Sequence, residues 1–98
     1  MQDLGSINSI LHERRAYIAR QFAVKRIGVF GSFVHGVQRS DSDIDILVEY
    51  EPSGVSFDNY MDLKFYLEDM LGIHVDLVIA DDVRDEIREE ILADVQYV

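Results

Sequence analysis

Three short apolar segments, separated by amphipathic ones, constrain the fold of this chain most. They are RIGVF at 26–30, DIDILVEY at 43–50 and HVDLVIA at 74–80. Their length and their content of β-branched residues are typical of strands. Helical patterns lie before, between and after them. This alternation predicts an α/β or α+β domain, in which the helices pack on a small sheet.

The helical segments are recognised by their apolar spacing and their caps. Ser6 can cap a first helix that runs to about Phe22, and Asp58 can cap a second helix that stops at Gly72. The third helix is expected from 83 to about 93, with apolar residues at every fourth position.

Composition excludes several classes of protein. The chain has 98 residues, no cysteine and a formal net charge of −10. This length supports one domain, and the lack of cysteine excludes a disulfide scaffold, a thiolate zinc site and a cysteine nucleophile. The acidity argues against direct binding of duplex nucleic acid, which requires a basic face. Without an apolar run of about 20 residues or a signal-peptide pattern, we expect a cytoplasmic protein that binds no membrane.

The segment 43–50 carries two carboxylates on alternate residues. In a strand, Asp43 and Asp45 project from one face, about 6–7 Å apart at the backbone, while Ile44, Ile46 and Val48 face the core. Neighbouring carboxylates repel each other and raise each other's pKa. A divalent cation removes this conflict, and Mg²⁺ prefers carboxylate oxygens. Asp43 and Asp45 are therefore predicted metal ligands.

A third carboxylate, Asp76, lies within the apolar segment 74–80. A carboxylate buried in such a strand is costly unless it has a partner. If this strand lies beside 43–50, at the usual spacing of about 4.8 Å, the three carboxylates can converge. Three acids can hold two Mg²⁺ ions about 3.5–4 Å apart, which suits an in-line phosphoryl displacement. We therefore predict Asp43, Asp45 and Asp76 as metal-binding and catalytic residues.

Gly31 and Ser32 follow the first predicted strand directly. Glycine lets the backbone approach a phosphate closely, and the serine hydroxyl and nearby N–H groups can donate to its oxygens. The alternative is a simple turn that ends the strand and begins a helix. We predict a phosphate-binding turn, in which backbone amides and Mg²⁺ take the place of a lysine cluster.

The run GSFVHGVQRSDSDIDILVEY at 31–50 resembles the signature of the DNA polymerase β-like nucleotidyltransferase superfamily. The short length resembles its minimal nucleotidyltransferases, the MNT-domain antitoxins, over the whole of 1–98 as a single domain. The resemblance implies a nucleotidyltransferase fold with a small mixed sheet. It implies that Gly31 and Ser32 bind nucleotide phosphates and that Asp43 and Asp45 ligate both Mg²⁺ ions. Asp76 would ligate the catalytic ion and help to activate the acceptor hydroxyl.

The resemblance also implies a reaction and a partner. The reaction is transfer of AMP from ATP to a hydroxyl, with a tyrosine of a helical HEPN-type toxin ribonuclease as acceptor, in a hetero-oligomer. An antitoxin that neutralises its partner by occlusion, with little or no catalysis, is the main alternative. It stays open because His35 stands where family members commonly have arginine in Gly-Ser-x-Ala-Arg-Gly. A small-molecule modifier of the aminoglycoside nucleotidyltransferase kind is a third reading, although those enzymes carry an additional domain.

Overall fold

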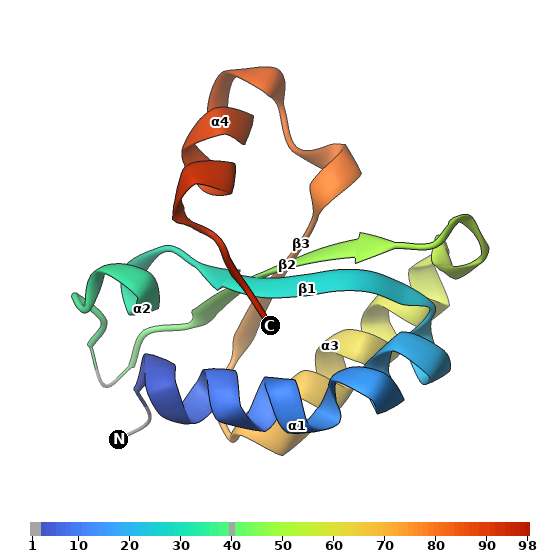
Figure 1. Ribbon diagram of the computed structural model, residues 1–98, viewed down its shortest axis with the longest axis horizontal. Coiled ribbons are helices and arrows are strands. Elements are labelled where there is room, and N and C mark those ends of the chain that lie inside the picture. Colours follow the sequence, from blue (N-terminus) through green and yellow to red (C-terminus); the bar gives the residue numbers. More distant parts are fainter. Residues whose placement is uncertain (1–2, 40) are drawn as a thin grey trace.

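A computed structural model describes residues 3–39 and 41–98 (Figure 1). It contains the predicted alternation of helices and strands. The elements are α1 (Leu4–Phe22), β1 (Val24–Phe30), α2 (Ser32–His35), β2 (Ile44–Tyr50), η1 (Pro52–Gly54), α3 (Phe57–Leu71), β3 (Val75–Ile79), η2 (Ala80–Asp82), α4 (Asp85–Asp94) and β4 (Gln96–Tyr97). The strand β4 was not predicted, because two residues are too few to show a periodicity.

The strands form one mixed sheet with the order β3-β2-β1-β4. β1 is antiparallel to β2 and to β4, whereas β2 and β3 are parallel. α1 and α3 cover one face of this sheet, and α4 stands over the other face (Figure 1). The small mixed sheet expected from the family resemblance is therefore confirmed.

The hydrophobic core lies between the sheet and the pair α1 and α3. Each helix contributes a stripe of buried side chains, and β2 contributes Ile44, Ile46 and Val48, all 0% exposed, as predicted. The helical side of the core consists of Ile7, Leu11, Ile18, Phe22, Leu63, Leu67 and Leu71. Within the described residues, no helix is both long and apolar enough to span a membrane.

The helix caps differ from the predicted ones at two positions. The carboxylate of Asp3, not Ser6, caps α1, because it accepts a hydrogen bond from the Ser6 N–H at 2.8 Å. Ser56, not Asp58, caps α3 and accepts from the Asn59 N–H at 3.1 Å. Each expected cap lies a few residues inside its helix, where several polar residues compete for the role. Gly72 ends α3 with a φ of 72°, as predicted.

Asn59 joins three segments beneath the sheet. Its side-chain amide donates to the carbonyl oxygens of Phe22 and Gly54, both at 2.8 Å. Replacing Asn59 by alanine is expected to lower the free energy of unfolding by about 1–3 kcal/mol, because partly buried carbonyls lose their donor. Urea unfolding measures this loss. The exposed neighbour Asp62→Ala is the control, expected to change stability by less than about 0.5 kcal/mol, and equal effects would contradict the role of Asn59.

Candidate functional site

The carboxylates of Asp45 and Asp76 lie side by side at one end of the sheet. The parallel register of β2 and β3 pairs these two residues directly. Both project from the face opposite α1 and α3, since the alternate residues Ile44 and Ile46 are buried in the core. Asp43 immediately precedes β2 at the same end. The topology thus assembles the two predicted acidic segments on the open face.

The electrostatics of Asp45 show how closely the three acids interact. The pKa of the Asp45 carboxyl is raised to about 6. Burial is the largest cause, followed by the charge of Asp76, a hydrogen bond with Asp76 and the charge of Asp43. Carboxylates held this closely favour the uptake of a proton or a cation. Among the described Asp, Glu and His side chains, however, no group of three or more has the spacing of a metal centre. Metal binding by Asp43, Asp45 and Asp76 therefore stays a prediction.

Asp76 is not the buried acid that its apolar segment suggested. Its side chain is exposed, because β3 is an edge strand and this face of the sheet is open at Asp76. The residue Leu47 shows the opposite behaviour: it lies on the same face as Asp45, yet it is only 1% exposed. Ile91 and Leu92 of α4 cover it. A strand pattern alone does not show which part of a face is covered.

The turn at Gly31 and Ser32 packs directly against Asp45. Gly31 ends β1 with a φ of 79°, and Ser32 begins α2. A Cβ added to Gly31 would lie 2.2 Å from Oδ2 of Asp45, so only glycine lets the turn come this close. The first amides of a helical turn have no partner within the helix and can donate to an anion. The candidate phosphate-binding turn and the acidic residues therefore form one continuous site.

His35, at the end of α2, is held by a residue that the sequence analysis did not single out. Its Nε2 lies 2.9 Å from Oδ2 of Asp94, at the end of α4. Spacing could not reveal this contact, because 59 positions separate the two residues. This contact joins the candidate phosphate-binding turn to α4.

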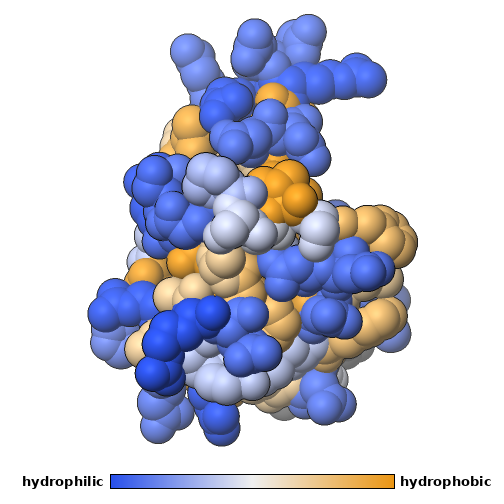
Figure 2. All heavy atoms as spheres, turned by 90° about the vertical axis from the view of Figure 1, so that its right-hand side faces the viewer, coloured by the Kyte–Doolittle hydropathy of each residue, from blue (hydrophilic) through white to orange (hydrophobic). Residues whose placement is uncertain are grey.

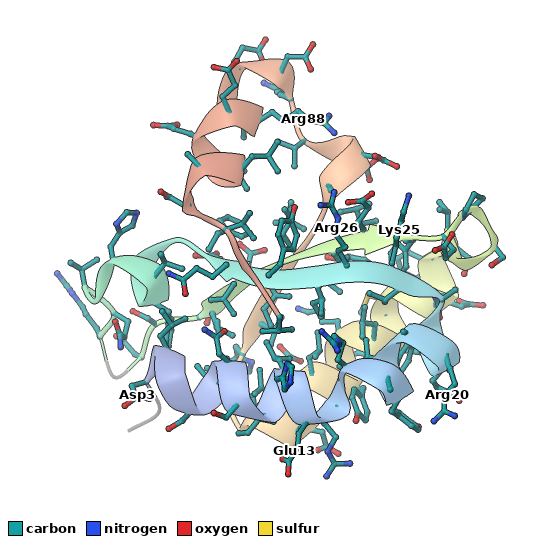
Figure 3. The ribbon with its side chains drawn as sticks, viewed as in Figure 1. Asp3, Glu13, Arg20, Lys25, Arg26 and Arg88 are labelled. Carbon is teal, nitrogen blue, oxygen red and sulfur yellow. The ribbon has the colours of Figure 1, made fainter. Side chains whose placement is uncertain are left out.

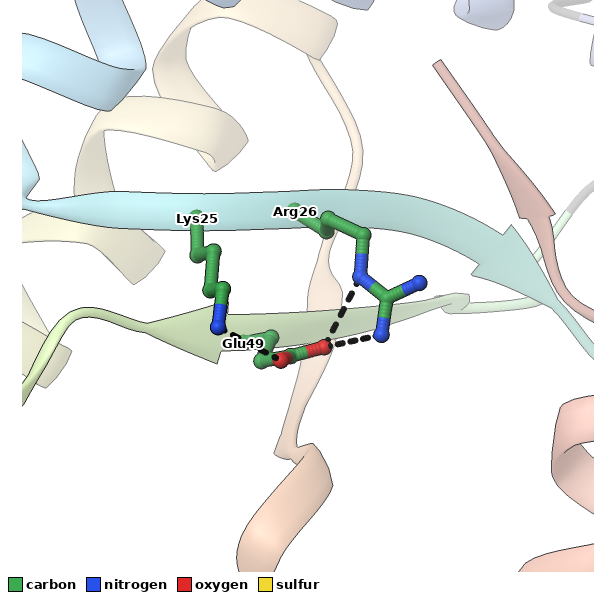
Figure 4. A network of polar contacts seen from close by, with 3 residues as sticks. All are labelled: Lys25, Arg26 and Glu49. Atoms are coloured by element: carbon green, nitrogen blue, oxygen red, sulfur yellow. Dashed lines mark hydrogen bonds and ion pairs between the residues drawn. The ribbon is translucent and has the colours of Figure 1, made fainter.

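The opposite end of the open face carries a separate polar network (Figure 4). Arg26 donates to Oε2 of Glu49 from Nε at 2.9 Å and from Nη2 at 2.6 Å, and Lys25 Nζ lies 3.8 Å from Oε1. An irregular register between Val24 and Arg26 allows consecutive cations to reach one carboxylate. Arg26 also stacks on Tyr97, at 4.7 Å from the ring centroid. The network links β1, β2 and β4 and lies apart from the predicted catalytic residues.

The sequence of this chain matches a known family of enzymes. The model of the nucleotidyltransferase domain family matches residues 11–98 of this chain. The chain belongs to this nucleotidyltransferase family. MntA from Thermococcus cleftensis, a protein adenylyltransferase, is 42% identical over 100 residues that cover 100% of this chain and 98% of MntA. The chain is therefore a nucleotidyltransferase enzyme of the MNT type.

Solved structures share the fold. One, assigned as a minimal nucleotidyltransferase, has a TM-score of 0.77 and 31% identity, over 97% of this chain and 95% of that chain. Another is the complex of an MNT antitoxin with the tri-AMPylated HEPN toxin of Shewanella oneidensis. It has a TM-score of 0.62 and 22% identity, over 93% of this chain and 66% of that chain. At this lower identity, the likeness extends to the fold alone.

Proposed function

We propose that this nucleotidyltransferase transfers AMP from ATP to a tyrosine hydroxyl of a HEPN-type toxin and thereby acts as an antitoxin. The observation that carries the proposal is the direct pairing of Asp45 with Asp76, against the turn at Gly31. A relative that is 42% identical over the whole chain is a protein adenylyltransferase. The MNT antitoxin that shares this fold is bound to an AMPylated HEPN toxin, which supports the choice of acceptor.

The residues of the site fit a divalent metal. The pKa of Asp45 is raised by its burial and by two neighbouring acids, a conflict that a cation would relieve. Asp43, Asp45 and Asp76 would supply the carboxylate ligands. Two bound Mg²⁺ ions would supply positive charge that stabilises the attacking and leaving oxygens.

The remaining steps follow from the protein groups. Gly31 and Ser32 would hold the β- and γ-phosphates through backbone amides and the serine hydroxyl. The acceptor oxygen attacks the α-phosphorus, the bond from that phosphorus to the β-phosphate oxygen breaks, and pyrophosphate leaves. The phenolic proton passes to the carboxylate of Asp76, which is open to solvent and can release it. The chain thus contributes mainly positioning and electrostatic stabilisation.

One experiment distinguishes AMP transfer from the alternative, in which the antitoxin neutralises the toxin by occlusion. ATP labelled at the α-phosphate is incubated with Mg²⁺, this protein and a cognate HEPN-type toxin, and the acceptor residue is assigned by mass spectrometry. We expect label on a tyrosine, and we expect it to be lost with Asp43→Asn or with a chelator. Toxin neutralisation that survives Asp43→Asn without any label transfer would support occlusion. Label on serine or threonine would refute the tyrosine acceptor.

A further inference from the structure

The helix α4 stands over the open face of the sheet and packs against it on one side only (Figure 1). None of its residues is buried, and Ile87 and Leu92 are each 46% exposed. Its contact with the sheet is a small apolar crevice, where Ile91 and Leu92 approach Leu47 and Ala80. The apolar stripe of α4 is therefore only partly covered by the rest of the chain.

This helix has little support of its own. Helices shorter than about 12–15 residues are marginal in water, and most helical stability in proteins comes from packing. Arg84, at the N-cap position, makes no side-chain cap hydrogen bond, and the last turn contains no basic residue. Asp94 lies unfavourably at the negative end of the helix dipole, and among the described residues its side chain contacts Nε2 of His35. A surface that covers the apolar stripe would stabilise α4 substantially.

The side chains around the stripe carry a strong negative charge. Residues 27–98 contain 17 acidic and four basic residues, and 81–94 alone contains seven acidic and two basic ones. Glu86 and Glu90 are exposed beside Ile87, and Arg88 lies on α4 near η2 (Figure 3). Figure 2 shows hydrophilic side chains gathered at this end of the molecule, with hydrophobic ones directly below them. A partner surface complementary to α4 would therefore carry apolar side chains flanked by lysine and arginine.

We infer that α4 is the helix on which the toxin docks. Ile87 and Leu92 form the exposed apolar centre of this surface, and the surrounding acidic side chains pair with basic residues of the partner. The inference rests on the proposed function, because it takes the acceptor protein as the occupant. α4 lies on the same face of the sheet as Asp45 and Asp76, so a protein bound there has access to the catalytic residues. The His35–Asp94 pair further fixes α4 relative to the phosphate-binding turn.

A second exposed apolar surface provides a matched control. Val55 and Phe57, which are 64% and 76% exposed, line a groove with Tyr60, Leu77 and Ile79 at the edge of β3. Leu77 lies in register with Ile46 and thus on the side of the sheet that α1 and α3 cover. A partner docked in this groove would face away from Asp76. Apolar exposure alone therefore does not distinguish the two surfaces, but their position relative to the acids does.

The test measures binding of a cognate HEPN-type toxin to this chain, by calorimetry. The variants are Ile87→Ser with Leu92→Ser, Glu86→Lys with Glu90→Lys, and the control Val55→Ser with Phe57→Ser. We expect each α4 pair to raise Kd about tenfold or more, as truncation of interface anchors does, and the control to leave it within about twofold. The charge-reversed pair is expected to lose the salt dependence of association as well.

The outcomes separate this inference from the proposed function. If the control weakens binding and the α4 variants do not, or if no variant weakens it, α4 is not the docking surface. If the unaltered chain itself fails to bind, the proposed partner is wrong, whichever surface is used. Melting curves check that each variant is folded. Hydrogen exchange on the unaltered complex adds an independent measurement, and a failure of residues 85–94 to gain protection on binding would also overturn the inference.

Discussion

Replacing Asp45 by asparagine is expected to abolish nucleotidyl transfer and, at the same time, to stabilise the metal-free protein above neutral pH. Transfer should fall by about a thousandfold or more, because charge stabilisation by a metal contributes several kcal/mol to such a transition state. The gain in stability has a separate origin. The carboxyl of Asp45 is partly buried next to Asp76 and Asp43, which raises its pKa to about 6. Asparagine has a similar shape and does not ionise.

The direction of the pH dependence follows from this pKa. The carboxyl has its ordinary value of 3.8 when unfolded and about 6 when folded, so the folded state holds the proton more tightly. The stabilisation that this proton provides is complete below the unfolded pKa and is lost as the pH rises through the folded one. At pH 8 the variant should therefore melt at a higher temperature than the unaltered protein. The difference should shrink between pH 6 and pH 4 and disappear below that range.

Thermal melting from pH 3.5 to 8.5, without metal, measures this effect, and Asp62→Asn on the outer surface of α3 is the control. Addition of Mg²⁺ and ATP reverses the order of stability, because only the unaltered protein gains stability from binding the pair. A difference in melting temperature that is constant over the whole pH range would contradict the assignment to Asp45. Full transfer activity in Asp45→Asn would contradict its role as a ligand.

The sequence is sufficient to predict that the acids can meet, because this depends on local spacing and on one strand pairing. Asp45 falls on the open face of β2 by alternation, and the parallel register of β3 then places Asp76 beside it, while Asp43 immediately precedes the strand. The core positions Ile44, Ile46 and Val48 follow from the same alternation, and all three are buried.

What the sequence does not predict depends on contacts between distant segments. The contact of His35 with Asp94 joins residues 59 positions apart, and no spacing rule connects them. The close pairing of β4 with β1 is similar: a Cβ added to Gly28 would lie 2.7 Å from the carbonyl oxygen of Gln96. The exposure of Asp76 was misjudged for the related reason that an apolar strand looks the same at the edge of a sheet as at its centre.

A single methyl group at Gly31 is expected to damage both the fold and the site. Gly31 has φ 79° and ψ −145°, a conformation that is almost restricted to glycine and costs other residues about 1–3 kcal/mol. The added Cβ would also lie 2.2 Å from Oδ2 and 3.1 Å from Cγ of Asp45. Asp45 must therefore move away from Asp76 or the turn must shift, and either change removes the alignment of phosphates and acids. We expect Gly31→Ala to lower transfer by at least about a hundredfold.

Gly36→Ala separates this steric effect from backbone strain. Gly36 also has a positive φ, 70°, but a Cβ added there would meet nothing within 4 Å. It should lose about 1–2 kcal/mol of stability from the left-handed conformation and keep most of the transfer activity. Removing the carboxylate offers a second check, because in an Asp45→Ala background the nearest atom of residue 45 to the new methyl would be its Cβ, at 3.4 Å. Gly31→Ala should then cost less stability than in the unaltered protein, and an equal cost in both backgrounds would show that contact with Asp45 is not what requires glycine here.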